Sequence, residues 1–158
     1  MKRANWLIAA TLALMMFVQP NKTNAAFGNG SLSGTYRGLA TGSFWSASQK
    51  FDFVYTTTFT FNGKGNAVET DTYTQQGTFG PVLIGPCDDA AACTYEVNHD
   101  GTGTAACTNT SSTCGDTGGT WRTAFTTDGD HIYFIITEYK ALQALSVSGT
   151  LVKDGFYQ

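Results

Sequence analysis

Aromatic and polar residues alternate along residues 51–61 of the chain. Phenylalanine or tyrosine occupies five of the six odd-numbered positions, while Asp, Val and three threonines occupy the even-numbered ones. A period of two residues is typical of a β-strand with one covered face and one solvated face. The chain is therefore predicted to form a β-sheet around an interior rich in aromatic side chains.

Seven further segments carry apolar or alternating runs bounded by Gly, Asn, Asp or Pro, and no segment after residue 26 keeps a 3.6-residue apolar spacing. The predicted strands are 33–42, 50–62, 65–76, 93–98, 102–108, 119–127, 131–139 and 144–153. Threonine and glycine are abundant, which also favours strands and turns over helices. We therefore expect an all-β domain.

Three predicted turns share one pattern, in which an apolar strand end is followed by Asn or Asp and then Gly. They lie at 61–65, 97–101 and 125–129. Asn, Asp and Gly accept the positive φ angles of tight hairpins, so successive strands are expected to pair with their neighbours. Eight such strands can close into an antiparallel up-and-down barrel, which leaves no exposed sheet edge. A two-sheet β-sandwich is the structural alternative.

The N-terminal segment has a different character. Two basic residues precede an apolar run at 6–18, and a small-residue site ending at Ala26 follows. This order is typical of a cleaved secretory signal peptide, and the run is shorter than the roughly twenty residues that span a bilayer as a helix. We expect a signal peptide at 1–26 and one secreted or periplasmic domain at 27–158. A retained membrane anchor is the alternative.

Charge and motifs narrow the possible functions. The segment 27–158 holds six basic and twelve acidic residues, a formal charge of −6, which disfavours nucleic acid as a partner. The sequence has no P-loop, dinucleotide fingerprint, G-x-S-x-G or H-E-x-x-H motif. No cofactor and no metal are therefore predicted, and the oligomeric state is left open.

One residue is a candidate for acid–base chemistry. Glu138 shares the alternating face of Ile132 and Phe134, and a carboxylate on an apolar face has a raised pKa, as a general acid or base requires. The alternative is that Glu138 lies past the barrel rim, in water. Glu69 and Asp71 share one face of another predicted strand, but their surroundings lack the spacing of a cation-coordinating loop.

The four cysteines are Cys87, Cys93, Cys107 and Cys114, and they suit two structural disulfides in an oxidising compartment. A three-residue hairpin loop at 99–101 would set Cys93 directly opposite Cys107. Cys87 and Cys114 then lie just beyond the same ladder, which predicts the nested bridges 93–107 and 87–114. Local bridges 87–93 and 107–114 are the alternative. The spacing lacks the paired C-x₂-C of a structural zinc site.

The first and last predicted strands carry a resemblance to a known family. Gly34-Thr35-Tyr36 opens the first strand, and Lys153 lies near the end of the last. A Gly-x-aromatic opening strand, a run of antiparallel hairpins and a closing basic residue resemble the lipocalin-like (calycin) barrels, in particular small exported bacterial β-barrel proteins. Allene oxide cyclases and dirigent proteins are more loosely similar. The resemblance implies an apolar ligand or substrate inside a barrel.

The inward aromatic row and its counterparts on later strands form the predicted ligand-binding set. It consists of Phe51, Phe53, Tyr55, Thr57, Phe59, Phe61, Trp121, Phe125 and Phe134. An eight-stranded barrel is either filled by its own side chains or holds one small ligand. Thr57 interrupts the aromatic row, and small residues such as Gly149 lie on other strands, which favours a pocket.

These patterns predict an exported protein that binds a small apolar or aromatic molecule. Two alternatives remain. One is a barrel enzyme of cyclase or isomerase type. The other is a structural or surface-interaction protein with a filled core.

Overall fold

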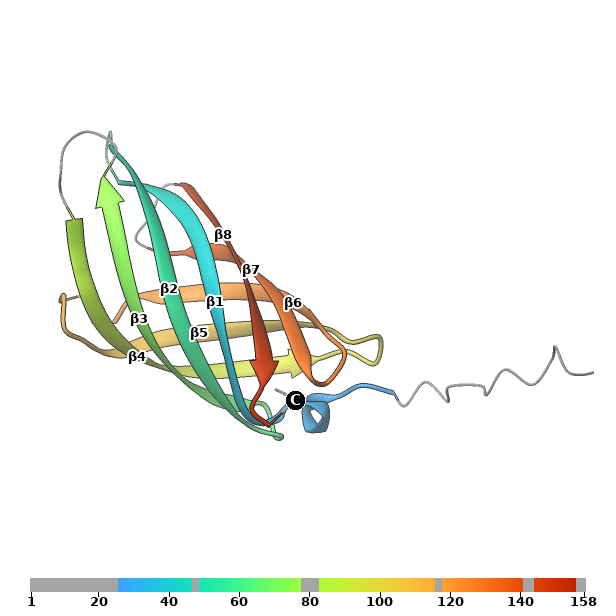
Figure 1. Cartoon of the computed structure of the whole chain (residues 1–158). Coiled ribbons are helices and arrows are strands. Elements are labelled where there is room, and N and C mark those ends of the chain that lie inside the picture. The colour runs from blue at the N-terminus through green and yellow to red at the C-terminus, as the bar shows by residue number, and fades with distance from the viewer. Residues whose placement is uncertain (1–25, 47–48, 78–82, 116–117, 141–143, 156–158) are drawn as a thin grey trace, which may run out of the picture.

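The computed structural model describes residues 26–46, 49–77, 83–115, 118–140 and 144–155. Eight antiparallel strands form a closed barrel in chain order, and β1 pairs with β8 to complete it (Figure 1). The strands are β1 (Ser33–Ser46), β2 (Gln49–Asn62), β3 (Asn66–Gly77), β4 (Leu83–Val97), β5 (Thr102–Ser112), β6 (Thr120–Thr127), β7 (His131–Tyr139) and β8 (Ala144–Lys153). The predicted up-and-down barrel is confirmed, and the β-sandwich alternative is wrong.

Strand β4 departs most from the prediction, because it begins at Leu83 and not at Cys93. The part of β4 before Cys93 holds Pro86, two aspartates and three alanines, which are poor strand formers. Pairing with β3 and β5 holds this segment in the sheet in spite of that composition. Strand β5 is also longer than predicted and ends at Ser112.

The predicted signal peptide at 1–26 lies outside the described residues, apart from Ala26. In the described part of the chain the helical content is one 3₁₀ turn, η1 (Asn29–Ser31). No helix among these residues is long and apolar enough to cross a membrane.

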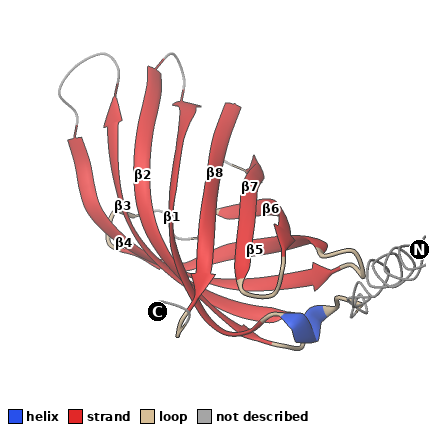
Figure 2. Ribbon diagram, turned by 45° about the vertical axis from the view of Figure 1, so that its right-hand side comes forward, coloured by secondary structure: helices blue, strands red, loops and turns tan. Residues whose placement is uncertain are grey.

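The two ends of the barrel differ. We call them the η1 end and the far end. The η1 end holds the 3₁₀ turn η1, the β2–β3, β4–β5 and β6–β7 turns, and the end of β8. At the far end β1 is followed by β2, and β7 is followed by β8. Strands β3, β2, β1 and β8 run side by side from the η1 end to the far end (Figure 2). The Tyr95 hydroxyl donates to the Leu32 carbonyl at 2.9 Å, and the Val97 amide donates to Asn29 Oδ1 at 2.8 Å. These bonds fasten η1 against the sheet.

The η1 end holds a packed apolar core. Tyr36 and Phe61 meet edge to face with ring centroids 5.3 Å apart, and Phe61 meets Tyr95 in the same way at 5.0 Å. The buried side chains at this end are Leu32, Tyr36, Phe61, Tyr95, Val97, Phe125, Ile132 and Leu151. The Tyr36 hydroxyl donates to the Gly129 carbonyl at 2.6 Å, so its polar atom has a partner. This end of the barrel is therefore sealed by its own side chains.

Each disulfide has one cysteine on β4. One bridge joins β4 to β5, and the other joins β4 to the residues just after β5. Cys93 pairs with Cys107, with Cα atoms 4.1 Å apart, and Cys87 pairs with Cys114 at 5.6 Å. The β4–β5 register shifts by one residue between Ala90 and Ala91. This bulge brings Cys114 opposite Cys87. The nested scheme is confirmed, and the local bridges are wrong.

Candidate functional site

The inner face of the barrel contains the predicted ligand-binding side chains. Six of them are buried: Tyr55, Thr57, Phe61, Trp121, Phe125 and Phe134. Three are partly exposed: Phe51, Phe53 and Phe59. Strand alternation thus brings the set into one interior, as predicted. That these residues bind a ligand remains a prediction.

Several side chains that pack against this core keep part of their surface exposed. They are Phe53, Phe59, Tyr73, Ala105, Ile136 and Tyr139. Exposed area on inward-facing side chains indicates that the barrel's own side chains do not fill the interior completely. Solvent therefore reaches inward-facing side chains beyond the packed η1 end.

Aromatic rings from two sides of the barrel line the accessible part. Phe53 and Tyr55 of β2 stack with centroids 5.9 Å apart, and Tyr73 of β3 lies directly opposite Tyr55. Trp121 of β6 and Tyr139 of β7 stack at 6.0 Å with an interplanar angle of 9°. These rings offer flat apolar surface with a few hydroxyl groups.

Carboxyl groups lie on the inner face beside these rings. Glu69 and Asp71 both face inward from β3, and Asp71 lies directly opposite Asp89 of β4. Thr57 donates a hydrogen bond of 2.8 Å to Glu69 Oε1. Asn109 Nδ2 lies 3.4 Å from Asp89 Oδ2. Four adjacent strands, β2 to β5, therefore build one polar cluster, which we call the carboxyl cluster (Thr57, Glu69, Asp71, Asp89 and Asn109).

Burial and mutual repulsion control the protonation of this cluster. Burial, followed by the nearby Asp71, raises the pKa of Glu69 to about 8, although the Thr57 hydrogen bond lowers it. Burial, followed by Asp89 and Asp88, raises the pKa of Asp71 to about 7. Burial also raises the pKa of Tyr55 well above its ordinary value. No basic group is among the causes of these shifts.

Glu69 is 2% exposed and has one unsatisfied oxygen. Its Oε2 atom is buried and has no hydrogen-bond partner among the described residues. Glu69 also lies against the Cys93–Cys107 disulfide, with one carboxylate oxygen and the two sulfurs within 4.8 Å of one another. Because those sulfurs are bonded to each other, they are not thiolate ligands, and this triad does not make a metal site.

The structure places Glu138 on the outer face, so the expectation of an inward carboxylate there is wrong. The β6–β7 register shifts between Arg122 and Thr123, and the extra residue on β7 reverses the alternation after Ile136. Arg122 Nε lies 3.5 Å from Glu138 Oε2, and both side chains are exposed, at 73% and 60%. Glu138 is therefore a solvated member of a surface ion pair.

The space expected around the small residues is also absent at Gly149. A Cβ atom at this position would lie 2.6 Å from Ala40 Cβ and 2.6 Å from the Phe134 ring. Gly149 thus makes room for Phe134, not for a ligand. Thr57 does not leave a gap either, because it is buried and bonded to Glu69.

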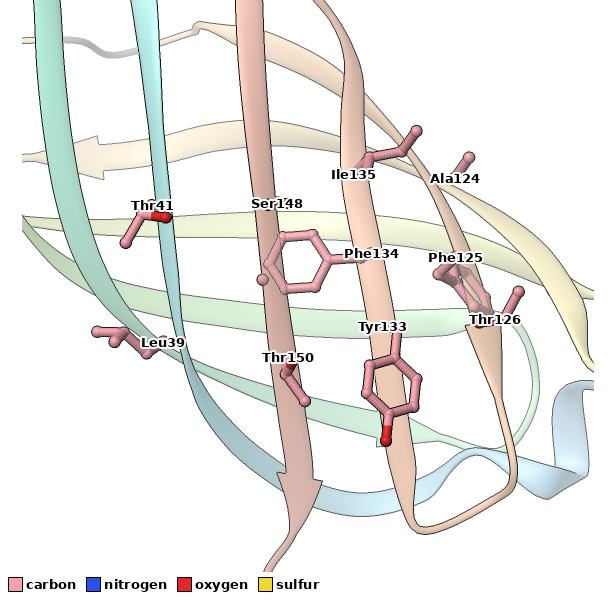
Figure 3. A pocket seen from close by; sticks show the side chains of 11 residues that line it. Leu39, Thr41, Ala124, Phe125, Thr126, Tyr133, Phe134, Ile135, Ser148 and Thr150 are labelled. Carbon is pink, nitrogen blue, oxygen red and sulfur yellow. The ribbon is translucent and has the colours of Figure 1, made fainter.

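A separate hollow of about 660 Å³ lies along β1, β8, β7 and β6. Figure 3 shows its lining side chains, which include Leu39 of β1, Thr150 of β8, and Tyr133 and Ile135 of β7. Leu39, Tyr133 and Ile135 are about half exposed. The lining residues that the structure describes include no Asp, Glu, His, Lys or Arg, and they offer mainly apolar surface.

Comparison with known proteins gives little guidance. No protein-family model matches the chain, and no curated protein matches it. Among solved structures, the chain is similar to the crystal structure of Rv2717c from M. tuberculosis, with 15% identity over 78% of this chain and 92% of that chain. The TM-score is 0.38, which is too low to carry an argument about this chain. Membership of the lipocalin-like barrels remains a prediction.

Proposed function

We propose that this protein is exported and binds one small organic molecule inside its barrel, between the sealed η1 end and the far end. The observation that carries the proposal is the partial exposure of inward-facing rings such as Phe53, Tyr73 and Tyr139. A protein whose barrel serves only as a packed core would bury these rings. The two disulfides are typical of an oxidising, extracytoplasmic environment and support export.

The lining determines the kind of molecule. Small-molecule pockets are mostly apolar and contain a few placed polar groups that fix orientation. Here the apolar surface comes from aromatic rings on β2, β3, β6 and β7, and the polar groups come from the carboxyl cluster. Aromatic rings prefer offset-stacked or edge-to-face neighbours, so a flat or aromatic guest fits this lining best.

One observation favours enzymatic activity as a second candidate. The pKa of Asp71, at about 7, is matched to proton transfer at neutral pH, and its side chain is partly exposed. A barrel of cyclase or isomerase type would use such a group as acid or base. Binding requires fewer positioned groups than catalysis does, so it remains the primary proposal.

A filling experiment tests the binding function. Ala105 faces inward from β5 and is partly exposed, whereas its neighbour Ala106 is exposed on the outer face. Ala105→Phe adds a ring to the interior, and Ala106→Phe adds the same ring outside. Binding of N-phenyl-1-naphthylamine, a neutral fluorescent probe, is measured for both variants and the parent.

If the interior has room, the parent and Ala106→Phe bind the probe, while Ala105→Phe is stable and binds it at least about tenfold more weakly, a change of about 1.4 kcal/mol. If the interior is filled, no variant binds the probe, and Ala105→Phe is destabilised by about 1–3 kcal/mol through overpacking. The second result, together with native mass spectra that show no bound molecule, would overturn the proposal in favour of a structural barrel.

A further inference from the structure

We propose that the molecule held in the barrel is an organic cation, an amine or quaternary ammonium on an aromatic or apolar body, whose charge lies against Glu69 and Asp71. This inference rests on the proposed function, because it requires an interior that admits a ligand. It adds the charge of the ligand and the side chains that recognise it.

The first argument is the placement of the acids. Strand alternation puts Glu69 and Asp71 two residues apart on one inner face, and the β3–β4 register puts Asp89 directly opposite Asp71. Like charges directly opposite each other on adjacent strands destabilise a sheet. Three carboxyl groups in one buried region therefore need either protons or a positive charge.

The second argument is independent of the number of acids. Glu69 Oε1 accepts the Thr57 hydroxyl, but the buried Oε2 atom has no donor among the described residues. A buried acceptor without a donor costs about 1–3 kcal/mol. A positive charge bound near the cluster would stabilise this buried carboxylate electrostatically, which an apolar ligand cannot do.

The basic side chains of the described residues do not supply the missing charge. Three of them form ion pairs elsewhere: Arg37 with Asp154, Lys50 with Asp52, and Arg122 with Glu138. A fourth, Lys153, lies over the ring of Tyr36. Lys64 lies in the exposed β2–β3 turn, and Lys140 is exposed after β7. The positive charge is therefore expected to come from a bound molecule.

Aromatic faces next to the acids select an organic cation. Tyr55 and Tyr73 form a cross-strand pair one step nearer the far end than Thr57 and Asp71, which are themselves directly opposite each other. Phe53 stacks on Tyr55 from the same direction. A cation within about 6 Å of a ring face is attracted by the ring quadrupole, and quaternary ammonium groups are recognised by such rings. The apolar body of the ligand would then lie along the rings.

A metal ion fits the cluster less well. Among the described residues, no three carboxyl groups bring oxygens within 4.8 Å of one another. Calcium requires six to eight oxygen ligands at close range, and magnesium requires near-octahedral geometry. The lining therefore favours a cation that is large, soft and partly apolar.

Binding of this cation should depend on pH. The titratable groups that face Glu69 are Tyr55 from β2, Asp71 from β3 and Asp89 from β4, while Asp88 also acts on Asp71; the disulfide against Glu69 does not titrate. Asp71 and Glu69 are neutral at low pH and ionise as the pH rises through about 7 and about 8, respectively. A cation prefers the ionised form, so its affinity should rise over this range and its binding should release protons.

The experiment compares two ligands of one shape on the folded protein. Phenyltrimethylammonium carries a permanent charge, and tert-butylbenzene is its neutral isostere, so ligand titration does not complicate the pH series. Calorimetry or tryptophan fluorescence measures both affinities from pH 6 to 9 for the parent, Glu69→Gln and Asp71→Asn. Glu138→Gln, on the outer face, is the matched control.

We expect phenyltrimethylammonium to bind at least tenfold more tightly than tert-butylbenzene at pH 8, with affinity that rises from pH 6 to 9. Glu69→Gln and Asp71→Asn should each reduce the cation affinity about tenfold, which corresponds to about 1.4 kcal/mol. They should leave tert-butylbenzene binding unchanged, which also shows that they fold. Glu138→Gln should behave like the parent.

Three outcomes would overturn the inference. If tert-butylbenzene binds as tightly as the cation at every pH, the binding function stands and the ligand is neutral. If calcium ions bind through Glu69 and Asp71 while the ammonium does not, the site is a metal site. If neither aromatic molecule binds and the Ala105→Phe test also fails, the binding function itself is wrong.

Discussion

Asp71 of β3 lies directly opposite Asp89 of β4 on the inner face of the barrel. Two carboxyl groups at such a position repel each other, and one of them raises the pKa of the other. Perturbed carboxyl groups of this kind are concentrated at functional sites, although structural networks also contain them. The pair therefore lies in the part of the barrel where stability depends on pH and for which binding is proposed above.

The stability of the folded protein should fall as the pH rises, which is the opposite of the effect that acidic groups usually have. Folding raises the pKa of Glu69 from 4.5 to about 8, so the native state holds the proton more tightly than the unfolded chain. The contribution of protonated Glu69 is complete below about pH 4.5 and is lost as the pH rises to about 8. Urea unfolding should show a less stable protein at pH 8 than at pH 5.

Glu69→Gln should remove the Glu69 share of this pH dependence and leave the share of Asp71, because the amide keeps an acceptor for Thr57 and carries no charge. At pH 8 the variant should be more stable than the parent by at least about 1 kcal/mol. Glu138→Gln should keep the parent's profile. An unchanged pH slope in Glu69→Gln would show that Glu69 is not the group responsible.

Thr57→Val should raise the pKa of Glu69 further. The Thr57 hydroxyl donates to the carboxylate and so stabilises its charged form, and valine keeps the shape without the donor. Thr57→Ser keeps the hydroxyl and serves as the control. Carbon-detected NMR titration of the Glu69 carboxyl measures the shift, and equal pKa values in both variants would contradict the assignment.

Removal of either disulfide should destabilise the barrel by about 2–4 kcal/mol. The two double variants are Cys93→Ala with Cys107→Ala, and Cys87→Ala with Cys114→Ala. Non-reducing peptide maps of each variant should show the other bridge intact, because the bridges lie on either side of the bulge at 90–91. Free thiols at the two remaining cysteines of either variant would contradict the nested arrangement.

Gly149→Ala should be destabilising, because its Cβ would overlap Ala40 and the Phe134 ring. Overpacking of this kind costs about 1–3 kcal/mol. Gly28→Ala is the control, since its φ of −174° suits any residue and no atom lies within 4 Å of the added Cβ. Thermal unfolding compares the two, and equal melting temperatures would show that the core at Gly149 can relax.

Much of the fold could be predicted from local patterns. The alternation of aromatic and polar residues in 51–61 predicted which side chains of β2 face inward. The pattern of Asn or Asp followed by Gly predicted the turns, and therefore the pairing of neighbouring strands. The hairpin loop at 99–101 set Cys93 opposite Cys107. These features depend on the period of the strand and on turn chemistry, both of which a sequence displays directly.

The candidate site was harder to predict from the sequence than the fold was. Asp89 and Asn109 lie just outside the predicted strands 93–98 and 102–108, so their inward orientation could not be inferred. The register shift that turns Glu138 outward depends on pairing with β6 and leaves no local signal. Glu69 and Asp71 were visible on one face with Ala67, but only the closed barrel shows that this face is the interior.

The position of the chain ends has a practical consequence for how the protein can be attached. The Phe27 amide donates to the His99 carbonyl at 3.2 Å, and the Asp154 amide donates to the Thr35 carbonyl at 2.8 Å, so both ends of the described barrel leave from the η1 end. A tether, tag or carrier domain joined at either end would therefore stand behind the sealed base. The far end would then point away from the support and face the surrounding solution.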